Sequence, residues 1–272
     1  DGDYIINCIG AIPQRTDKFQ VNYELPIWLD KNVTCRVIHQ DTDARREEDE
    51  YGFSKAEAAR YLAMDGKRTK MLKTNVIGHD KNKVCLLDWF LNSEGEVFGY
   101  TESYSNGSTT LEWAKQIYKM MNNWERYAKC TTISTKCISK YELLNLFKEV
   151  YNKDIVINKK TNLQNNRCLK GQLKVPSLKE QLEELKEFLE SVENKSVREF
   201  YWCGGEPLMW KIHWTAMQRV VELGYANEVF ARYNSNMSRI TYFGKNLFDD
   251  VLSKFRDWQI NASIDGTGEI GE

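Results

Sequence analysis

The sequence of 272 residues lacks the long hydrophobic runs that membrane-spanning helices need. Its longest apolar stretches, such as VCLLDWFL at residues 84–91, are far shorter than the ~20 residues that cross a bilayer. Charge of one sign is not in excess either, since 38 Lys and Arg are balanced by 39 Asp and Glu. Nucleic-acid-binding surfaces usually appear as a basic excess. The composition therefore predicts a globular protein that binds neither a membrane nor a nucleic acid.

Histidines are scarce, and the cysteines follow no regular spacing. The three histidines lie at residues 39, 79 and 213, and this wide separation favours core or surface positions over a metal site. The seven cysteines do not show the spacing of a disulfide framework. An odd number of dispersed thiols is typical of a reducing compartment, so we expect free cysteines and a cytoplasmic protein. The first residues, DGDYIINCIG, show no basic leader or signal-peptide core, which agrees with that expectation.

Apolar runs of strand length alternate with helical patterns along nearly the whole chain, which predicts an α/β fold. Strands are expected at residues 4–12, 34–40, 70–78, 197–203, 228–234 and 259–265, and helices at residues 19–32, 51–66, 109–123, 139–152, 177–192, 211–223 and 245–256. Capping boxes begin the helices at Ser139 and Ser177. The polar stretch 158–176 is the plausible boundary, so we expect domains over residues 1–171 and 172–272.

The segment YGFSK places a tyrosine and a lysine one helical turn apart. Tyr51 and Lys55, at positions i and i+4, should share a helix face about 6 Å apart. An ammonium beside a phenol favours the phenolate, so we expect Lys55 to lower the pKa of Tyr51 from ~10 and to make it an acid or base near neutral pH. By itself this spacing is common on solvated helices. Two strand ends add weight: HQDTD supplies the Thr42 hydroxyl for a carbonyl, and INCIGA supplies small residues, including Cys8 and Gly10, for a cofactor that passes close to the backbone.

Together these segments resemble the extended short-chain dehydrogenase/reductases, particularly the branch of dTDP-4-dehydrorhamnose reductases and sugar-nucleotide-binding proteins. The matching segments, over roughly residues 3–171, are IINCIGAI, VNYELPIWL, DTD, YGFSKAEA, LKTNVIG, LLDWFL, GYTESYSNGSTTLEWAK, SKYELLNLFKEVYNKDIVI and NRCLKG. The resemblance implies a Rossmann-like, NAD(P)-binding domain that reduces or epimerises a nucleotide-linked keto-sugar. It also implies that Thr42 polarises the sugar carbonyl, Tyr51 delivers the proton and Lys55 holds the nicotinamide ribose. Cys8 and Gly10 would lie beside the cofactor.

Two features depart from this family pattern. The family's opening strand and Gly-rich phosphate turn have no counterpart, so the domain is interpreted as truncated at its N-terminus. Only eight residues separate Thr42 from Tyr51, where the family has a longer loop. GTGEIG at residues 266–271 matches a dinucleotide fingerprint literally, but the helix and the acid that should follow it are missing, so we interpret it as a loop.

A second resemblance begins near Pro176. YWCGGEPLMW, ARYNSNMS and NASIDGTGEIGE resemble segments of radical S-adenosylmethionine (SAM) enzymes with a twitch-type C-terminal domain. This implies a partial radical SAM (β/α) barrel over residues 172–272. By the same resemblance, S-adenosylmethionine would be bound by Gly204, Gly205, Glu206, Pro207, Asn234, Asn236, Ser263 and Asp265. The alternative for the two glycines is a strand-to-helix turn that serves packing alone.

The 4Fe-4S cluster of that family needs a C-x-x-x-C-x-x-C loop, and this spacing does not occur in the sequence. Cluster and S-adenosylmethionine are therefore cofactors of the parent family, and no metal ligands are expected in this chain. The sequence is interpreted as two truncated enzymes joined near residue 172, with little activity as it stands. The alternative is a non-catalytic protein that still binds a sugar nucleotide or a protein partner.

Overall fold

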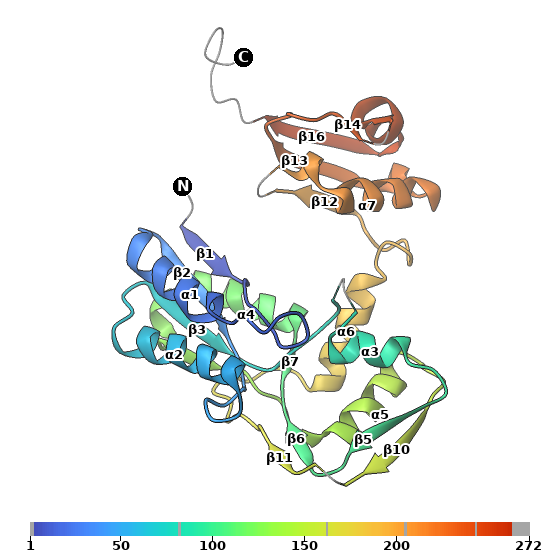
Figure 1. Ribbon diagram of the computed structural model, residues 1–272. Helices are drawn as coiled ribbons and strands as arrows, with labels where there is room; N and C mark the ends of the chain where they lie inside the picture. The colour runs from blue at the N-terminus through green and yellow to red at the C-terminus, as the bar shows by residue number, and fades with distance from the viewer. Residues whose placement is uncertain (1–2, 81–82, 162, 204–205, 243, 263–272) are drawn as a thin grey trace. The chain divides into compact units, whose positions relative to one another are not determined.

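Parallel strands connected by helices form the first sheet of the N-terminal part (Figure 1). The computed structural model describes residues 3–80, 83–161, 163–203, 206–242 and 244–262. The strands are β1 (Tyr4–Asn7), β2 (Arg36–Asp41), β3 (Thr69–Lys73) and β8 (Cys130–Thr132), all parallel and in the order β1-β2-β3-β8. The helices around them are α1 (Val21–Asn32), α2 (Glu50–Met64) and α4 (Thr110–Asn122). The predicted α/β fold is confirmed here.

Helices cover both faces of this sheet. Helix α4 packs on the face that carries Ile38 and Leu72, where Trp113 and Ile117 belong to the same apolar cluster. Helices α1 and α2 lie on the opposite face (Figure 1). With both faces covered, three successive residues of β2, residues 37–39, are all buried.

The other strands of the first unit form small sheets. β5 (Glu96–Tyr100) pairs in parallel with β10 (Val156–Lys160), and β4 (Val76–Ile77) pairs with β7 (Ser108–Thr109). β6 (Ser103–Ser105) lies between β11 (Asn165–Asn166), which is parallel to it, and β9 (Ile138–Ser139), which is antiparallel. Helices α3 (Leu86–Asn92) and α5 (Lys140–Val150) pack together through Phe90 and Phe147. The predicted capping box of Ser139 and Glu142 is confirmed at the start of α5.

Helix α6 (Leu178–Leu189) contributes its apolar stripe to the first unit. Its Leu182 is fully buried in the cluster that α3 and α5 form. The chain divides into two compact units between Lys186 and Glu187, so the boundary expected after residue 171 lies inside the first unit. A polar stretch indicates exposure to solvent, but it does not indicate which core the next amphipathic helix will join.

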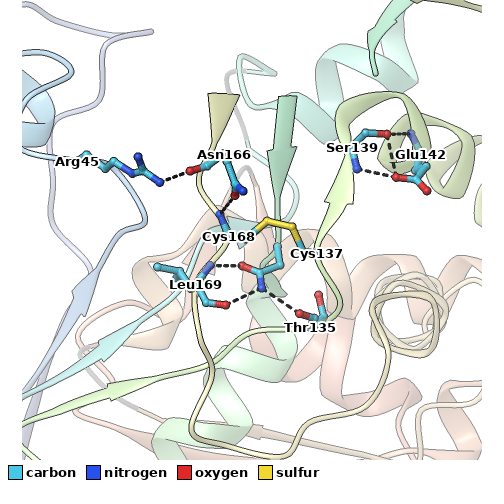
Figure 2. The surroundings of a disulfide bond; sticks show 9 residues. Arg45, Thr135, Cys137, Ser139, Glu142, Asn166, Cys168 and Leu169 are labelled. Carbon is cyan, nitrogen blue, oxygen red and sulfur yellow. Dashed lines mark hydrogen bonds between the residues drawn. A yellow bond between two sulfur atoms is a disulfide. The ribbon is translucent and has the colours of Figure 1, made fainter. Parts of the chain in front are cut away.

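A disulfide joins Cys137, which precedes β9, to Cys168, which follows β11 (Figure 2). Their Cα atoms are 5.7 Å apart. The prediction that all cysteines are free is therefore wrong for this pair. The free cysteines are Cys8, Cys35, Cys85, Cys130 and Cys203. The two partners are 31 positions apart, and they meet because β9 and β11 flank the same strand, which cysteine spacing cannot reveal.

The second unit contains a parallel sheet of three strands in the order β12-β13-β16. They are β12 (Glu199–Trp202), β13 (Phe230–Ser235) and β16 (Asp257–Ala262), and helix α7 (Lys211–Glu222) lies between the first two in the sequence. Trp214, Met217 and Tyr233 are buried in the apolar core of this unit. A (β/α) barrel is not seen among the described residues of the unit.

One helix expected in the second unit is replaced by turns. β14 (Thr241–Tyr242) and β15 (Lys245–Asn246) form a short hairpin at the start of the expected helix 245–256. Between this hairpin and strand β16, the chain forms only a π-helical turn at Leu247–Val251 and a 3₁₀ turn at Leu252–Lys254. Across the described parts of both units, no helix is both long and apolar enough to cross a membrane.

Candidate active site

The carboxyl ends of β1, β2 and β3 meet at one edge of the first sheet. The three strands run in parallel, so the residues that follow them are neighbours. In open α/β sheets this is the edge at which ligands bind. Asn7 ends β1, Asp41 ends β2 and Lys73 ends β3, and the predicted site residue Thr42 follows β2 directly.

Thr42 and Tyr51 come together at this edge across a short loop. The Asp49 side chain caps α2 by accepting a hydrogen bond from the Gly52 N–H at 2.6 Å, and Tyr51 lies in the first turn. A Cβ on Gly52 would lie 2.0 Å from the Arg45 carbonyl oxygen, so the tight loop requires glycine there. The Thr42 hydroxyl donates to the Asp43 Oδ1 at 3.3 Å, and it lies near enough to the Tyr51 hydroxyl to act on its pKa. The short loop therefore keeps these two groups adjacent.

The pKa of Tyr51 is raised above its ordinary value of 10. Burial is the largest cause, and three nearby aspartates, Asp43 foremost, raise the pKa further, while the Thr42 hydroxyl opposes the shift. Lys55 is not among the groups that act on it. The predicted lowering of this pKa by Lys55 is wrong, because residues at i and i+4 share a helix face but a long lysine side chain can turn away from its neighbour. The raised pKa keeps the phenol protonated, so Tyr51 has a proton to donate at neutral pH.

The Lys55 ammonium lies against the loop after β1. A Cβ placed on Gly10 would be 3.4 Å from the Lys55 Nζ and 3.3 Å from the Asn22 Oδ1. Lys55 is only 4% exposed, and none of the residues described by the structure accepts a hydrogen bond from it. Burial lowers the pKa of Lys55, and the Asp41 carboxylate opposes that shift. An ammonium without a protein acceptor fits a ligand that brings hydroxyl groups, such as the ribose of a dinucleotide.

Asn22 of α1 fixes the loop that passes Lys55. Its Oδ1 accepts from the Ala11 N–H at 2.8 Å, and its Nδ2 donates to the Ala11 carbonyl at 3.0 Å and to the Ser54 hydroxyl at 3.1 Å. Asn22 is fully buried. The sequence analysis assigned this residue no role, although it lies in the matching segment VNYELPIWL. Its amide ties α1, α2 and the loop after β1 together.

A buried pair of polar side chains supports β1 and β2 beneath this loop. The Asn7 amide donates to His39 Nδ1 at 3.1 Å, and the Asn7 Oδ1 accepts from the Ile9 N–H at 3.1 Å. Burial lowers the pKa of His39 to about 3, and the Lys55 ammonium adds to the effect, so His39 is neutral. Cys8, predicted beside the cofactor, is exposed next to this pair in the chain.

Charged residues that the sequence analysis did not assign to the site lie at the same edge. The Asp41 Oδ2 is 3.4 Å from the Lys73 Nζ. Asp43 is buried, which raises its pKa, while Arg167 and Lys140 lower it. In the sequence, the two aspartates that flank Thr42 in DTD indicate acidic side chains at this edge of the sheet. The two distant cations gave no sequence signal, because more than ninety residues separate either from DTD.

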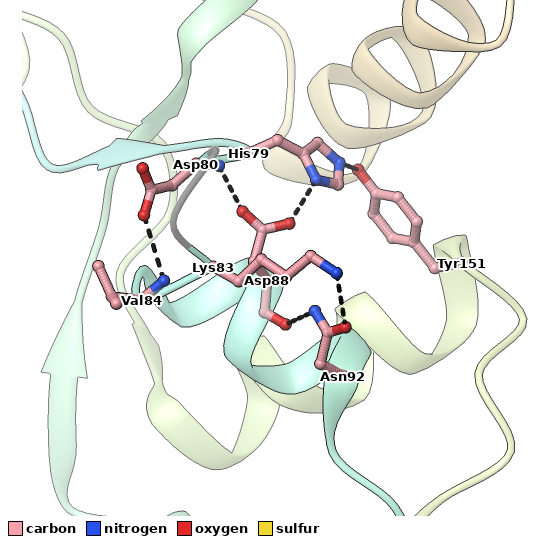
Figure 3. A network of polar contacts seen from close by, with 7 residues as sticks. All are labelled: His79, Asp80, Lys83, Val84, Asp88, Asn92 and Tyr151. Atoms are coloured by element: carbon pink, nitrogen blue, oxygen red, sulfur yellow. Dashed lines mark hydrogen bonds and ion pairs between the residues drawn. The ribbon is translucent and has the colours of Figure 1, made fainter.

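A second polar network of the first unit surrounds His79 (Figure 3). His79 Nδ1 is 2.7 Å from Asp88 Oδ1, and His79 Nε2 is 3.3 Å from the Tyr151 hydroxyl. The Asp80 N–H donates to the other Asp88 oxygen. These contacts tie the loop after β4 to α3 and α5. The described part of the chain holds no group of three or more His, Cys, Asp or Glu side chains that could bind a metal ion.

Glu206 organises the carboxyl ends of β12 and β13 in the second unit. Its oxygens accept hydrogen bonds from the Leu208 N–H at 3.1 Å, the Ser235 hydroxyl at 2.7 Å and the Asn236 N–H at 2.8 Å. Pro207 begins the 3₁₀ turn that follows. The structure thus brings together Glu206, Pro207 and Asn236, three of the residues predicted for S-adenosylmethionine. Ser235, which the sequence did not single out, contacts the same carboxylate.

Asn234 is engaged within the same sheet. Its Nδ2 donates to the Tyr201 hydroxyl at 2.8 Å, and its Oδ1 accepts from the Asn261 amide at 2.9 Å. Four further residues predicted for this site lie outside the described residues, as does the GTGEIG segment: Gly204, Gly205, Ser263 and Asp265.

Comparison with known proteins gives a match in structure but not in sequence. No family model matches the sequence. No curated protein matches it either. Solved structures do match, and the similarity covers about two thirds of the chain or more in those described below.

The similar structures are sugar-nucleotide enzymes. The dTDP-4-dehydrorhamnose reductase of Bacillus anthracis, in complex with NADP, is 14% identical, with 70% of this chain and 81% of that chain covered and a TM-score of 0.56. The corresponding protein of Clostridium acetobutylicum is 16% identical, with 69% and 81% covered and a TM-score of 0.55. UDP-glucose 4-epimerase of Thermotoga maritima, with UDP-glucose, is 15% identical, with 70% and 78% covered and a TM-score of 0.51. The mixed α/β fold with parallel sheets resembles these Rossmann-like structures.

Proposed function

We propose that the first unit binds NAD(P) and reduces, or epimerises, a nucleotide-linked keto-sugar. The observation that carries the proposal is the Lys55 side chain, which is only 4% exposed and has no acceptor among the described residues, beside Gly10 and one helical turn from Tyr51. The fold supports it, because similar structures include a reductase in complex with NADP and an epimerase with UDP-glucose. The family resemblance of the segments around these residues supports the same reaction.

Each of these side chains has a distinct task in the proposed reaction. Bound NAD(P)H supplies a hydride for the carbonyl carbon of the sugar. The Thr42 hydroxyl donates a hydrogen bond to the carbonyl oxygen, which stabilises the negative charge that develops there. Tyr51 delivers a proton to that oxygen, and its raised pKa ensures that the proton is present at neutral pH. Lys55 donates to the ribose hydroxyls, and Asn22 holds the loop against which they rest.

Replacement of Tyr51 by phenylalanine tests the proposal. We expect Tyr51→Phe to lower the rate of NADPH oxidation with a dTDP-4-keto-sugar by ~10²–10⁴-fold, the range of general acid catalysis. The dissociation constant for NADPH, measured by fluorescence titration, should stay within about twofold, because only the proton donor is removed. Tyr61→Phe, on the same helix, is the matched control and should retain full turnover.

Two outcomes would count against this assignment. Full turnover by Tyr51→Phe would show that Tyr51 is not the proton donor. Binding of NADPH and sugar nucleotide by the unaltered protein without any turnover would favour the alternative, a non-catalytic protein that binds a sugar nucleotide or a partner.

For the second unit we propose a narrower role, in which Glu206 accepts hydrogen bonds from the ammonium of S-adenosylmethionine. The support is the resemblance of the GGEP turn together with the position of Glu206 at the strand ends, where two carboxylate oxygens offer about four acceptor sites and three are used. The 4Fe-4S cluster does not fit this chain, because the three-cysteine loop does not occur in it. Calorimetric titration of S-adenosylmethionine into Glu206→Gln and the unaltered protein would test the proposed contact.

A further inference from the structure

The segment that contains Asn166, Arg167 and Cys168 is held by a short pairing with β6, by side-chain hydrogen bonds and by one disulfide, and Figure 2 shows the surroundings of the disulfide. In the pairing, the Asn165 N–H donates to the Glu102 carbonyl at 3.1 Å and the Arg167 N–H donates to the Tyr104 carbonyl at 2.9 Å. Cys168 is bonded to Cys137, and the Asn106 side chain accepts from the Leu169 N–H at 2.8 Å and donates to the Leu169 carbonyl at 2.9 Å. Strand β11 itself is only two residues long. The disulfide is the one covalent constraint on this segment among the described residues.

The same segment holds the loop between Thr42 and Tyr51. Arg167 forms a two-pronged ion pair with Glu48, in which the Arg167 Nε is 3.1 Å from the Glu48 Oε1. The Arg45 guanidinium donates to the Asn166 carbonyl (Figure 2). Both partners on the loop side lie between the two hydroxyl-bearing residues of the candidate active site. The position of that loop therefore depends on the position of the Arg167 segment.

The disulfide also lies beside two cations that act on the active-site edge. Arg167 directly precedes Cys168, and Lys140 follows Cys137 by three residues. Arg167 and Lys140 are the two cations that act on the buried Asp43 carboxylate, next to Thr42. One covalent bond thus joins the two chain segments whose cations act on Asp43.

We propose that the Cys137–Cys168 disulfide is a redox-sensitive positioning element for the Thr42–Tyr51 loop. In the oxidised protein it holds Arg167 on Glu48, and the loop keeps the two hydroxyls close together. In the reduced protein the Arg167 segment keeps its pairing with β6 and its bonds to Asn106 but loses its covalent tie, which loosens the anchor of the loop. This inference rests on the proposed function for its effect on turnover, but its effect on the loop does not depend on it.

The switching reaction is thiol–disulfide exchange with a dithiol reductant. A thiolate of the reductant attacks one sulfur and the S–S bond breaks, which gives a mixed disulfide. The second thiol of the reductant resolves it, so the reductant becomes a disulfide and the two cysteine sulfurs gain two electrons and two protons. Cys137 is exposed, which gives the reductant access.

Hydrogen exchange of the intact protein, with and without dithiothreitol, provides a readout that needs no substrate. We expect reduction to speed exchange in peptides that cover residues 44–53 and 165–169 and to leave β2 and β3 unchanged, because both strands are paired on both sides within the first sheet. The double variant Cys137→Ser/Cys168→Ser should show the fast exchange without reductant and no further response to it. Cys35→Ser, a free cysteine elsewhere, is the matched control and should behave like the unaltered protein.

Turnover provides the second readout. If reduction misplaces the reacting groups by about 1 Å, kcat should fall by up to ~10²-fold with little change in the dissociation constant for NADPH. Arg167→Met should reproduce this fall in the oxidised protein, and Arg167→Lys should restore part of the rate, since it keeps one contact to Glu48. This split between kcat and cofactor binding separates positioning from general loss of structure.

The results distinguish the two proposals. Faster exchange in the two peptides after reduction, with no turnover in any form, would support the positioning element and overturn the proposed reductase activity. Unchanged exchange, with turnover that is equal in the oxidised and reduced protein, would overturn the positioning element and leave the reductase activity in place.

Discussion

At the scale of single residues, the candidate active site contains buried polar side chains, some with hydrogen-bond partners and some without. Lys55 is the clearest case, because its side chain is nearly buried, its pKa is lowered by burial and the described residues offer its ammonium no acceptor. Such a group is costly in the free protein and useful only when a ligand supplies the missing acceptors. We therefore expect Lys55 to lower the stability of the free protein and to strengthen the binding of its ligand.

The variant Lys55→Met tests both effects of Lys55, on stability and on binding. At neutral pH we expect the free energy of unfolding to rise by ~1 kcal/mol or more, because an unpaired buried charge is replaced by an apolar side chain of similar length. The dissociation constant for NADPH should rise at the same time. Urea denaturation and fluorescence titration measure the two effects, and Lys67→Met, at an exposed position, is the control.

The lowered pKa of Lys55 determines how its effect on the free energy of unfolding changes with pH. Between the folded pKa and the unfolded value of ~10.4, the unfolded state binds more protons, so the unaltered protein gains stability as pH rises through this interval. The advantage of Lys55→Met should shrink accordingly in alkaline buffer. A variant that is less stable than the unaltered protein at pH 7 would contradict the assignment of an unpaired ammonium.

At the scale of secondary-structure elements, Asp30 joins α1 to the start of β3. Its carboxylate accepts hydrogen bonds from the N–H groups of Lys67 at 3.0 Å, Arg68 at 2.9 Å and Thr69 at 2.9 Å. Burial alone would raise the pKa of Asp30, but these backbone donors outweigh it and lower the pKa. One carboxylate thus sets where the third strand of the first sheet begins.

Asp30→Asn should destabilise the protein by ~2 kcal/mol at pH 7, since hydrogen bonds to a charged acceptor are lost and the new NH₂ group faces backbone donors. The stabilisation by Asp30 is fully present above the unfolded pKa of ~3.9 and is lost as pH falls through the lowered folded pKa. The difference between variant and unaltered protein in urea midpoint should therefore narrow in strong acid. Asp17→Asn, at an exposed position, should change the midpoint little at either pH.

At the scale of the whole molecule, each unit buries a neutral histidine. Burial lowers the pKa of His39 to about 3, with Lys55 adding to the effect. Burial lowers the pKa of His213 to about 4, against the opposing charge of Glu206, and its Nε2 is 2.9 Å from the Tyr233 hydroxyl. Both values lie below the ordinary 6.5, so both units share the same sensitivity to acid.

We expect both units to lose stability as pH falls from about 6.5 towards 4. In this interval the unfolded state binds protons that the folded state excludes, which costs about 1.4 kcal/mol per pH unit for each histidine. Hydrogen exchange resolved by peptide can follow β2 and α7 separately. His39→Gln should flatten the pH dependence in β2 alone and leave that in α7 unchanged, whereas an unchanged slope in β2 would rule out His39 as the cause.

The sequence by itself determined the features that depend on local interactions. The strands β1, β2 and β3, the helices α1, α2, α4 and α5, and the capping boxes at Ser139 and Ser177 were predicted because periodicity and hydrogen bonds between close neighbours fix them. The family resemblance of DTD and YGFSKAEA assigned Thr42 and Tyr51 to the same reaction, although only eight residues separate them.

Only the tertiary structure decided the features that depend on residues far apart in the chain. It directed the Lys55 ammonium to Gly10 and not to Tyr51, paired Cys137 with Cys168, and placed α6 in the core of the first unit. In each case the deciding partner comes from another element, and the energy of burial or bonding depends on that partner's position. Helical spacing and cysteine spacing contain no information about the position of that partner. Local geometry allows a long side chain several orientations, and contacts with distant elements decide which one it adopts.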